Sequence, residues 1–119
     1  MSKEISPKEF SRMMPHMPKD LKIPCAILYK MEGCGWCNKM EADWDEVGEK
    51  VGFMNVYHFG IDSNKDNVQH WTKIENSLET EIEGFPAVMF YKPDGRCILH
   101  TGYSTSDETI KKMIKFCEN

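Results

Sequence analysis

The sequence feature that most constrains the fold is a Cys-x-x-Cys motif, Cys34-Gly35-Trp36-Cys37, placed between two different kinds of segment. The apolar run before it predicts a buried strand over 24–31, and the periodicity after it predicts a helix from about 35 to 50. A strand that leads into a helix puts Cys34 at the helix N-terminus, where free N–H groups and the helix dipole stabilise a thiolate. Two cysteines at this spacing close into a small disulfide ring and open again, so the motif is a candidate for disulfide exchange.

The rest of the chain predicts an alternation of helices and strands. Helices are expected near 7–14, 35–50 and 64–78 and after the capping box at 105–108, and strands at 24–31, 53–61, 87–92 and 96–101. The segment 53–61 is apolar on both faces, which is typical of a central parallel strand, and Lys92-Pro93-Asp94-Gly95 is a strong hairpin turn. These units predict an α/β fold, with a central mixed sheet of four to five strands flanked by about four helices.

Length and charge limit the number of domains and the classes of partner. With 119 residues the chain is expected to form one domain, 1–119, with an N-terminal helix and loop at 1–21 and a core at 22–118. The net charge of −4 argues against nucleic-acid binding. No apolar stretch approaches the ~20 residues that span a membrane, so no membrane association is expected. The N-terminus lacks an apolar signal core, so a cytoplasmic location is expected. We also expect the protein to be a monomer.

The number of cysteines argues for a reducing compartment. There are five, at positions 25, 34, 37, 97 and 117, and an odd number is a poor framework of structural disulfides. We expect one functional pair, Cys34 and Cys37, and three reduced, mostly buried thiols whose roles the sequence does not assign. Zinc needs about four ligands, and Cys25, Cys97 and the scattered histidines offer no second pair. We therefore expect no metal and no cofactor apart from the redox-active disulfide.

In these motifs the chain resembles the thioredoxin superfamily over roughly residues 22–118. Besides Cys-x-x-Cys, the likeness rests on Gly84-Phe85-Pro86 before a strand, and on the hairpin Pro93-Asp94-Gly95 followed by Gly102 and a last helix. The resemblance implies a thioredoxin fold, and a cis bond before Pro86 that faces the disulfide. It also implies that the backbone of Phe85 pairs with an extended substrate chain beside Cys34.

The function implied by the resemblance is thiol–disulfide oxidoreductase. Cys34 attacks a protein disulfide, and Cys37 resolves the resulting mixed disulfide. The same steps reduce, oxidise or isomerise disulfides, so a disulfide isomerase-like activity is the alternative to a thioredoxin-like reductase. The expected partners are proteins with disulfides, and a reductase or glutathione for recycling. A non-catalytic thioredoxin-fold adaptor is the rival from another class.

The chain departs from the thioredoxin pattern at four positions. Where thioredoxins carry a buried aspartate, six residues before the first cysteine, this chain has Leu28. Lys30 replaces a tryptophan, Trp36 replaces a proline between the cysteines, and Ala42 replaces a proline in the helix. The missing carboxylate puts efficient proton removal from Cys37 in question.

Two of these residues have more than one interpretation. Trp36 is either an exposed contact for a substrate or partner, or a residue folded over its own loop. Lys30 either lowers the pKa of a neighbouring thiol or is a solvated lysine with little effect. We take Trp36, Phe85 and Pro86 as candidate substrate-binding residues and Lys30 as a candidate pKa modulator.

Overall fold

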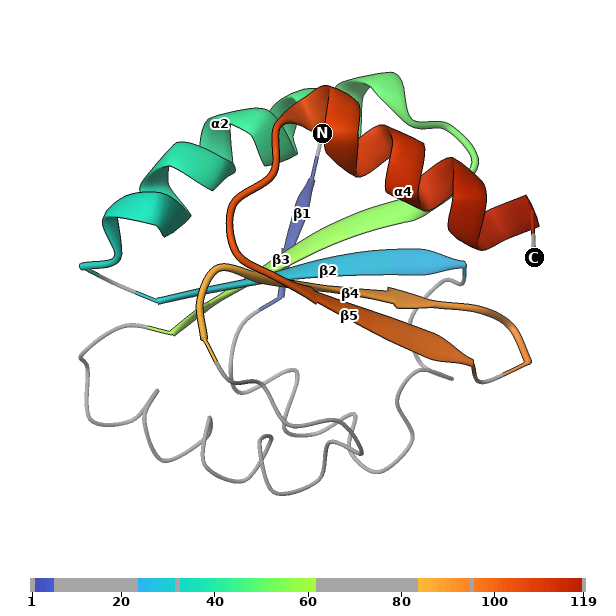
Figure 1. Ribbon diagram of the computed structural model, residues 1–119, viewed down its shortest axis with the longest axis horizontal. Helices are drawn as coiled ribbons and strands as arrows, with labels where there is room; N and C mark the ends of the chain where they lie inside the picture. The colour runs from blue at the N-terminus through green and yellow to red at the C-terminus, as the bar shows by residue number, and fades with distance from the viewer. Residues whose placement is uncertain (1, 6–23, 32, 62–83, 95, 119) are drawn as a thin grey trace.

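The computed structural model describes residues 2–5, 24–31, 33–61, 84–94 and 96–118. Within these ranges the chain forms five strands and two helices (Figure 1). The strands are β1 (Lys3–Ile5), β2 (Cys25–Met31), β3 (Asn55–Ile61), β4 (Ala87–Tyr91) and β5 (Cys97–Thr101), and the helices are α2 (Gly35–Lys50) and α4 (Ser106–Glu118). The helices expected near 7–14 and 64–78 lie outside the described residues.

The strands form one mixed sheet in the order β1-β3-β2-β4-β5. β3 is parallel to both of its neighbours, β1 and β2, whereas β4 is antiparallel to β2 and β5. The mixed five-stranded sheet, the parallel environment of β3 and the β4–β5 hairpin agree with the prediction. β1 is a correction, because the expected helix and loop of 1–21 did not include a strand. Three residues are too short for a recognisable alternation, and it is the pairing of Lys3–Ile5 with Tyr57–Phe59 that makes them a strand.

Both helices lie on the same face of the sheet (Figure 1). Because side chains alternate along a strand, Ala26 and Leu28 of β2 point toward the helices, whereas Cys25, Ile27 and Tyr29 point to the opposite face. All five side chains are fully buried. A strand buried on both faces explains why β2 is a continuous apolar run.

The helix α2 is held to the sheet by one apolar stripe. Its buried residues are Cys37, Met40, Trp44 and Val47, at the spacing from which the helix was predicted. Trp44 also donates its indole N–H to the carbonyl oxygen of Tyr57 on β3, at 2.9 Å. The stripe fixes the rotation of α2 about its axis, and therefore turns Cys37, in the first turn of the helix, toward the sheet.

The helix α4 begins at the capping box that the sequence indicates. Thr105 Oγ1 accepts the backbone N–H of Glu108 at 3.2 Å, as a residue preceding a helix does. Met113 is fully buried, but Ile114 is 43% exposed and Cys117 is also exposed. The expectation of mostly buried thiols is therefore wrong for Cys117, because α4 turns that position away from the sheet.

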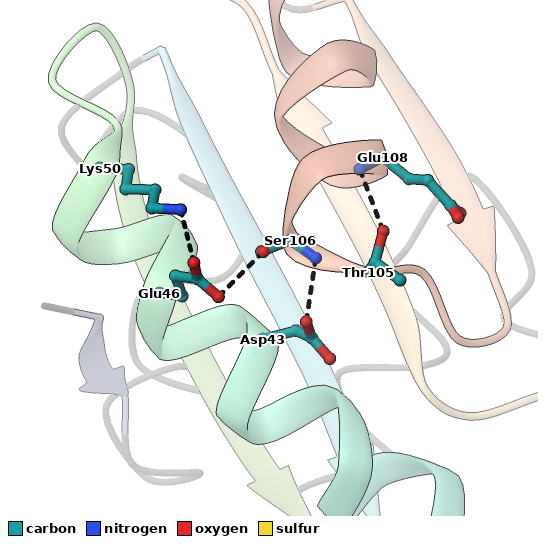
Figure 2. A network of polar contacts seen from close by, with 6 residues as sticks. All are labelled: Asp43, Glu46, Lys50, Thr105, Ser106 and Glu108. Atoms are coloured by element: carbon teal, nitrogen blue, oxygen red, sulfur yellow. Dashed lines mark hydrogen bonds and ion pairs between the residues drawn. The ribbon is translucent and has the colours of Figure 1, made fainter.

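A polar network joins the start of α4 to the middle of α2 (Figure 2). Asp43 accepts the backbone N–H of Ser106 at 3.0 Å, and Glu46 accepts the Ser106 hydroxyl at 3.0 Å. Glu46 also pairs with Lys50 one turn further along α2. These contacts fix the position at which the chain leaves the sheet and enters α4.

Candidate functional site

The two cysteines of the motif lie where β2 leads into α2. Gly33 forms part of the turn from β2 to α2, and its φ of +82° is a backbone conformation that favours glycine. The backbone N–H of Cys34 then bonds to the carbonyl oxygen of Met31 at 3.2 Å, and Cys34 becomes the N-cap of α2. Its Sγ accepts the backbone N–H of Cys37 at 3.2 Å. The sulfur therefore lies at the positive end of the helix dipole and accepts one of the free N–H groups of the first turn.

Cys37 lies one turn inside the helix, and its side chain is 1% exposed. The pKa of the Cys37 thiol is raised to about 11, first by burial and then by the hydrogen bond with Cys34. A backbone hydrogen bond from Met31 and the charge of Lys30 oppose this rise in pKa. Leu28 is fully buried on the same face of the sheet, so the position of the thioredoxin aspartate is apolar here. Cys34 is therefore the accessible thiol of the pair and Cys37 the shielded one.

A segment far along the chain closes the site beside Cys34. The Phe85–Pro86 peptide bond is cis, the isomer that the resemblance implies. Cys34 Sγ is 3.8 Å from the carbonyl oxygen of Phe85, a distance at which a thiol donates a weak hydrogen bond. Pro86 is buried directly before β4. The structure thus brings together Cys34, Phe85 and Pro86, which the sequence analysis had grouped only through the resemblance.

A groove of about 350 Å³ opens next to these residues. It is lined by Trp36, Phe85, Pro86, Gly102 and Tyr103. Trp36 is 59% exposed, which agrees with the interpretation of this residue as an exposed side chain. All three residues proposed for substrate binding therefore line one concave surface beside the accessible thiol.

Two residues that contact Trp36 were missed by the sequence analysis. The ring of Tyr103 lies 5.7 Å from that of Trp36, and the ammonium of Lys39 lies 5.2 Å from the Trp36 ring and 4.8 Å from the Tyr103 ring. Lys39 follows Trp36 by three positions, the spacing of neighbours on one helix face, so helical geometry could have indicated it. No local signal pointed to Tyr103, which approaches from the loop after β5.

Lys30 is largely buried and paired. Its side chain is 23% exposed, and its Nζ is 3.0 Å from Glu41 Oε1 on α2. It is therefore not the freely solvated lysine of one interpretation. Its charge lowers the pKa of Cys37, as expected if Lys30 acts on a neighbouring thiol. The effect of burial on the pKa of Cys37 is larger and opposite.

The other cysteines have different environments, and none of the five is in a disulfide in the structure. Cys25 is fully buried, and burial raises its pKa to about 12. Cys97 is partly buried. In the described part of the chain, no group of three or more metal-binding side chains comes together. None of the described helices is long and apolar enough to span a membrane.

Comparisons with known proteins agree with this geometry. The sequence profile of the thioredoxin-like domain family matches residues 12–117. Among solved structures, chloroplastic thioredoxin z superposes with a TM-score of 0.64 at 12% identity, over 99% of this chain and 96% of that chain. Plasmodium falciparum thioredoxin superposes with a TM-score of 0.61 at 22% identity, over 97% of both chains.

A third similar structure is the C-terminal domain of Neisseria meningitidis DsbD, in its oxidised form. It superposes with a TM-score of 0.58 at 17% identity, over 91% of this chain and 90% of that chain. At such low identities these structures establish the fold. The comparison with curated proteins found no match.

Proposed function

The chain belongs to the thioredoxin-like domain family, and on this premise we propose that it is a thiol–disulfide oxidoreductase of protein substrates. The observation that supports this best is the pair of thiols at the start of α2. Cys34 caps the helix and accepts the N–H of Cys37, while Cys37 is buried one turn inside. One accessible thiol and one shielded thiol suit two successive steps.

In the first step the Cys34 thiolate attacks one sulfur of a substrate disulfide. A new disulfide joins Cys34 to the substrate, the substrate's own S–S bond breaks, and its second sulfur leaves as a thiolate that takes a proton from water. In the second step Cys37, after losing its proton, attacks Cys34 Sγ. The mixed disulfide breaks, the substrate leaves with both sulfurs reduced, and Cys34 and Cys37 are joined.

The groove provides a surface for the substrate segment next to its reactive cysteine. Phe85 lies against Cys34 and contributes to the groove together with Trp36, Pro86 and Tyr103. We propose that an extended substrate segment lies over Phe85 and Pro86, with an apolar side chain against Trp36. The exposed ring of Trp36 loses water contact when this side chain is bound, which stabilises the complex.

The direction of the reaction depends on the redox potential of the pair. Potentials in this superfamily run from about −270 mV in thioredoxin to about −120 mV in the strongest oxidant. A potential near that of thioredoxin favours reduction of substrates, with a reductase or glutathione for recycling. A less negative potential favours a disulfide isomerase-like role. Equilibration of the Cys34–Cys37 pair with glutathione measures this potential. For the compartment we propose the reducing cytoplasm, given the odd number of cysteines.

Insulin reduction with dithiothreitol as the electron donor tests the proposal. The wild-type protein should accelerate the precipitation of the insulin B chain, and Cys34→Ser should abolish this acceleration. Cys117→Ser is the matched control, because it removes an exposed thiol outside the site. A folded wild-type protein that gives no acceleration would instead support the adaptor, which needs the groove but no turnover.

A further inference from the structure

Cys37 has a charged neighbour that orthodox thioredoxins lack at this position. Lys30 is the next-to-last residue of β2, and its ammonium pairs with Glu41 at 3.0 Å. Glu41 lies four residues after Cys37 on α2, so the two side chains emerge from the same face of the helix, one turn apart. The ion pair therefore bridges the end of β2 and the turn of α2 that follows Cys37.

The surroundings of Lys30 hold its side chain between the sheet and the helix. Lys30 is on the same face of β2 as Leu28, two residues along, and Gly60 is its partner on β3. A methyl group at Gly60 would lie 3.6 Å from Lys30 Cε, so the aliphatic stem runs close over the β3 backbone. With 23% of its side chain exposed, Lys30 is only partly screened by water.

The charged and titratable groups around this position come from four elements. Cys34 and Lys30 act on Cys37, the first raising its pKa and the second lowering it.

His58 on β3 is opposite Leu28 in the sheet register, and it bonds to Ser2 Oγ at 2.5 Å. The groups that act on His58 are Lys30 on β2, Glu4 on β1, and Asp45 and Glu41 on α2. Burial and Lys30 lower the pKa of His58, which favours the neutral imidazole.

We propose that the Lys30 ammonium, held in place by Glu41, stabilises the Cys37 thiolate while Cys37 attacks the mixed disulfide. This inference rests on the proposed function. The Cys37 thiol gives its proton to water, its thiolate bonds to Cys34 Sγ, and the bond between Cys34 and the substrate breaks with the electron pair leaving on the substrate sulfur. Lys30 exchanges no proton in this step; it offsets through its charge part of the cost of an anion in a buried position. Glu41 is a positioning residue, because it acts through Lys30.

Stopped-flow measurement of a two-step reaction tests the proposal. The reagent is an aromatic disulfide whose thiolate is coloured, and the protein is the full chain with Cys97→Ser and Cys117→Ser, so that the reactive thiols are those of the site. The first release of colour reports attack by Cys34, and the second reports attack by Cys37. Rates of the second release are measured from pH 6 to 9.

Lys30→Met keeps the length of the side chain and removes its charge. We expect its second release to be about tenfold slower at pH 7, the change in thiolate fraction for one pKa unit, and its rate–pH curve to move to higher pH. Lys30→Arg should restore the rate to near the wild-type value. Glu41→Gln should slow the second release, but less than Lys30→Met does. Glu49 is an exposed residue on the same helix, so the matched control Glu49→Gln should leave the rate of the second release unchanged.

An unchanged rate and an unchanged pH curve in Lys30→Met would overturn the inference. A second release in Lys30→Arg as slow as that in Lys30→Met would also overturn it, because the packing of the lysine rather than its charge would then be responsible. A faster second release in Glu41→Gln would overturn the positioning role of Glu41. If Lys30→Met does not fold, Lys30→Gln carries the same expectation. A wild-type protein with no second release contradicts the proposed function itself, which separates that failure from failure of the inference.

Discussion

The hydroxyl of Tyr103 donates a 2.6 Å hydrogen bond to Asp43 Oδ2, joining the loop after β5 to the middle of α2. The same carboxylate accepts the backbone N–H of Ser106 at the start of α4. The bond to Asp43 raises the pKa of Tyr103, so its hydroxyl stays protonated and able to donate. One side chain that does not line the groove therefore holds both a wall of the groove and the first turn of the last helix.

Asp43→Ala should weaken both the fold and substrate binding. We expect a loss of about 1–2 kcal/mol in the free energy of unfolding, because the Ser106 N–H and the Tyr103 hydroxyl both lose their acceptor. Without its acceptor Tyr103 should no longer hold its ring against Trp36, so KM for insulin should rise more than kcat falls. Urea unfolding and steady-state kinetics measure the two effects. Asp45→Ala on the same helix is the control and should change stability by less than about 0.5 kcal/mol.

Cys37→Ser should accumulate covalent complexes with disulfide-containing substrates, and Cys34→Ser should not. The reason is geometric, because Cys34 borders the groove while Cys37 is shielded within α2. Non-reducing electrophoresis followed by mass spectrometry detects the complexes and identifies the bonded cysteine. Equal trapping by Cys34→Ser would reverse the assignment of the attacking and resolving thiols.

Trp44→Phe should destabilise the fold by about 1–3 kcal/mol, since the Tyr57 carbonyl oxygen loses a buried donor and the smaller ring leaves a space. Trp36→Phe is the matched control. The Trp36 side chain is 59% exposed, so this change should alter stability by less than about 0.5 kcal/mol. Urea unfolding followed by circular dichroism measures both. A similar loss in the two variants would contradict the role assigned to the indole N–H.

Stability should fall at alkaline pH because buried thiols resist ionisation. The pKa of Cys25 is about 12 in the fold, against an ordinary value of 9.0. Since the folded-state pKa is the higher one, the contribution of Cys25 is fully present below pH 9 and is lost as the pH rises toward 12. In Cys25→Ala the decline above pH 9 should be shallower by about 1.4 kcal/mol for each pH unit.

Unfolding free energies measured at several pH values up to 10.5 check the Cys25 prediction. The comparison is between slopes rather than absolute values, because Cys25→Ala also loses buried contacts. Tyr29 is fully buried, and burial raises its pKa as well, with a smaller contribution from Cys25; because Tyr29 is present in both proteins, most of its effect on the slope cancels. Parallel slopes would show that ionisation of Cys25 does not limit alkaline stability.

Leu28→Asp should place a carboxylate near Cys37 and speed the resolution of the mixed disulfide between pH 6 and 9. Leu28 is fully buried opposite His58, so the change should also cost about 2–5 kcal/mol of stability. Rate and stability are therefore measured on the same samples. A folded variant that resolves no faster would show that the apolar side chain at this position does not limit the second step.

The helix α2 shows how far local patterns extend. The three- and four-residue spacing of Cys37, Met40, Trp44 and Val47 predicted both the helix and its buried face. The capping box at Thr105 and the turn between β4 and β5 were equally local. Each involves interactions between residues within about one helical turn or one hairpin of each other, which sequence patterns record directly.

By itself, then, the sequence determined the α/β order, the helix that positions Cys34 and Cys37, and the apolar residue at position 28. Only the tertiary structure decided that Lys3–Ile5 would pair with β3, that Tyr103 would meet Trp36, and that Lys30 would pair with Glu41. These contacts join elements that are separate in the chain, so no spacing in the sequence encodes them. The two side-chain contacts form because α2 packs against the sheet beside the end of β2 and the loop after β5, whereas Lys3–Ile5 is held by backbone pairing with β3.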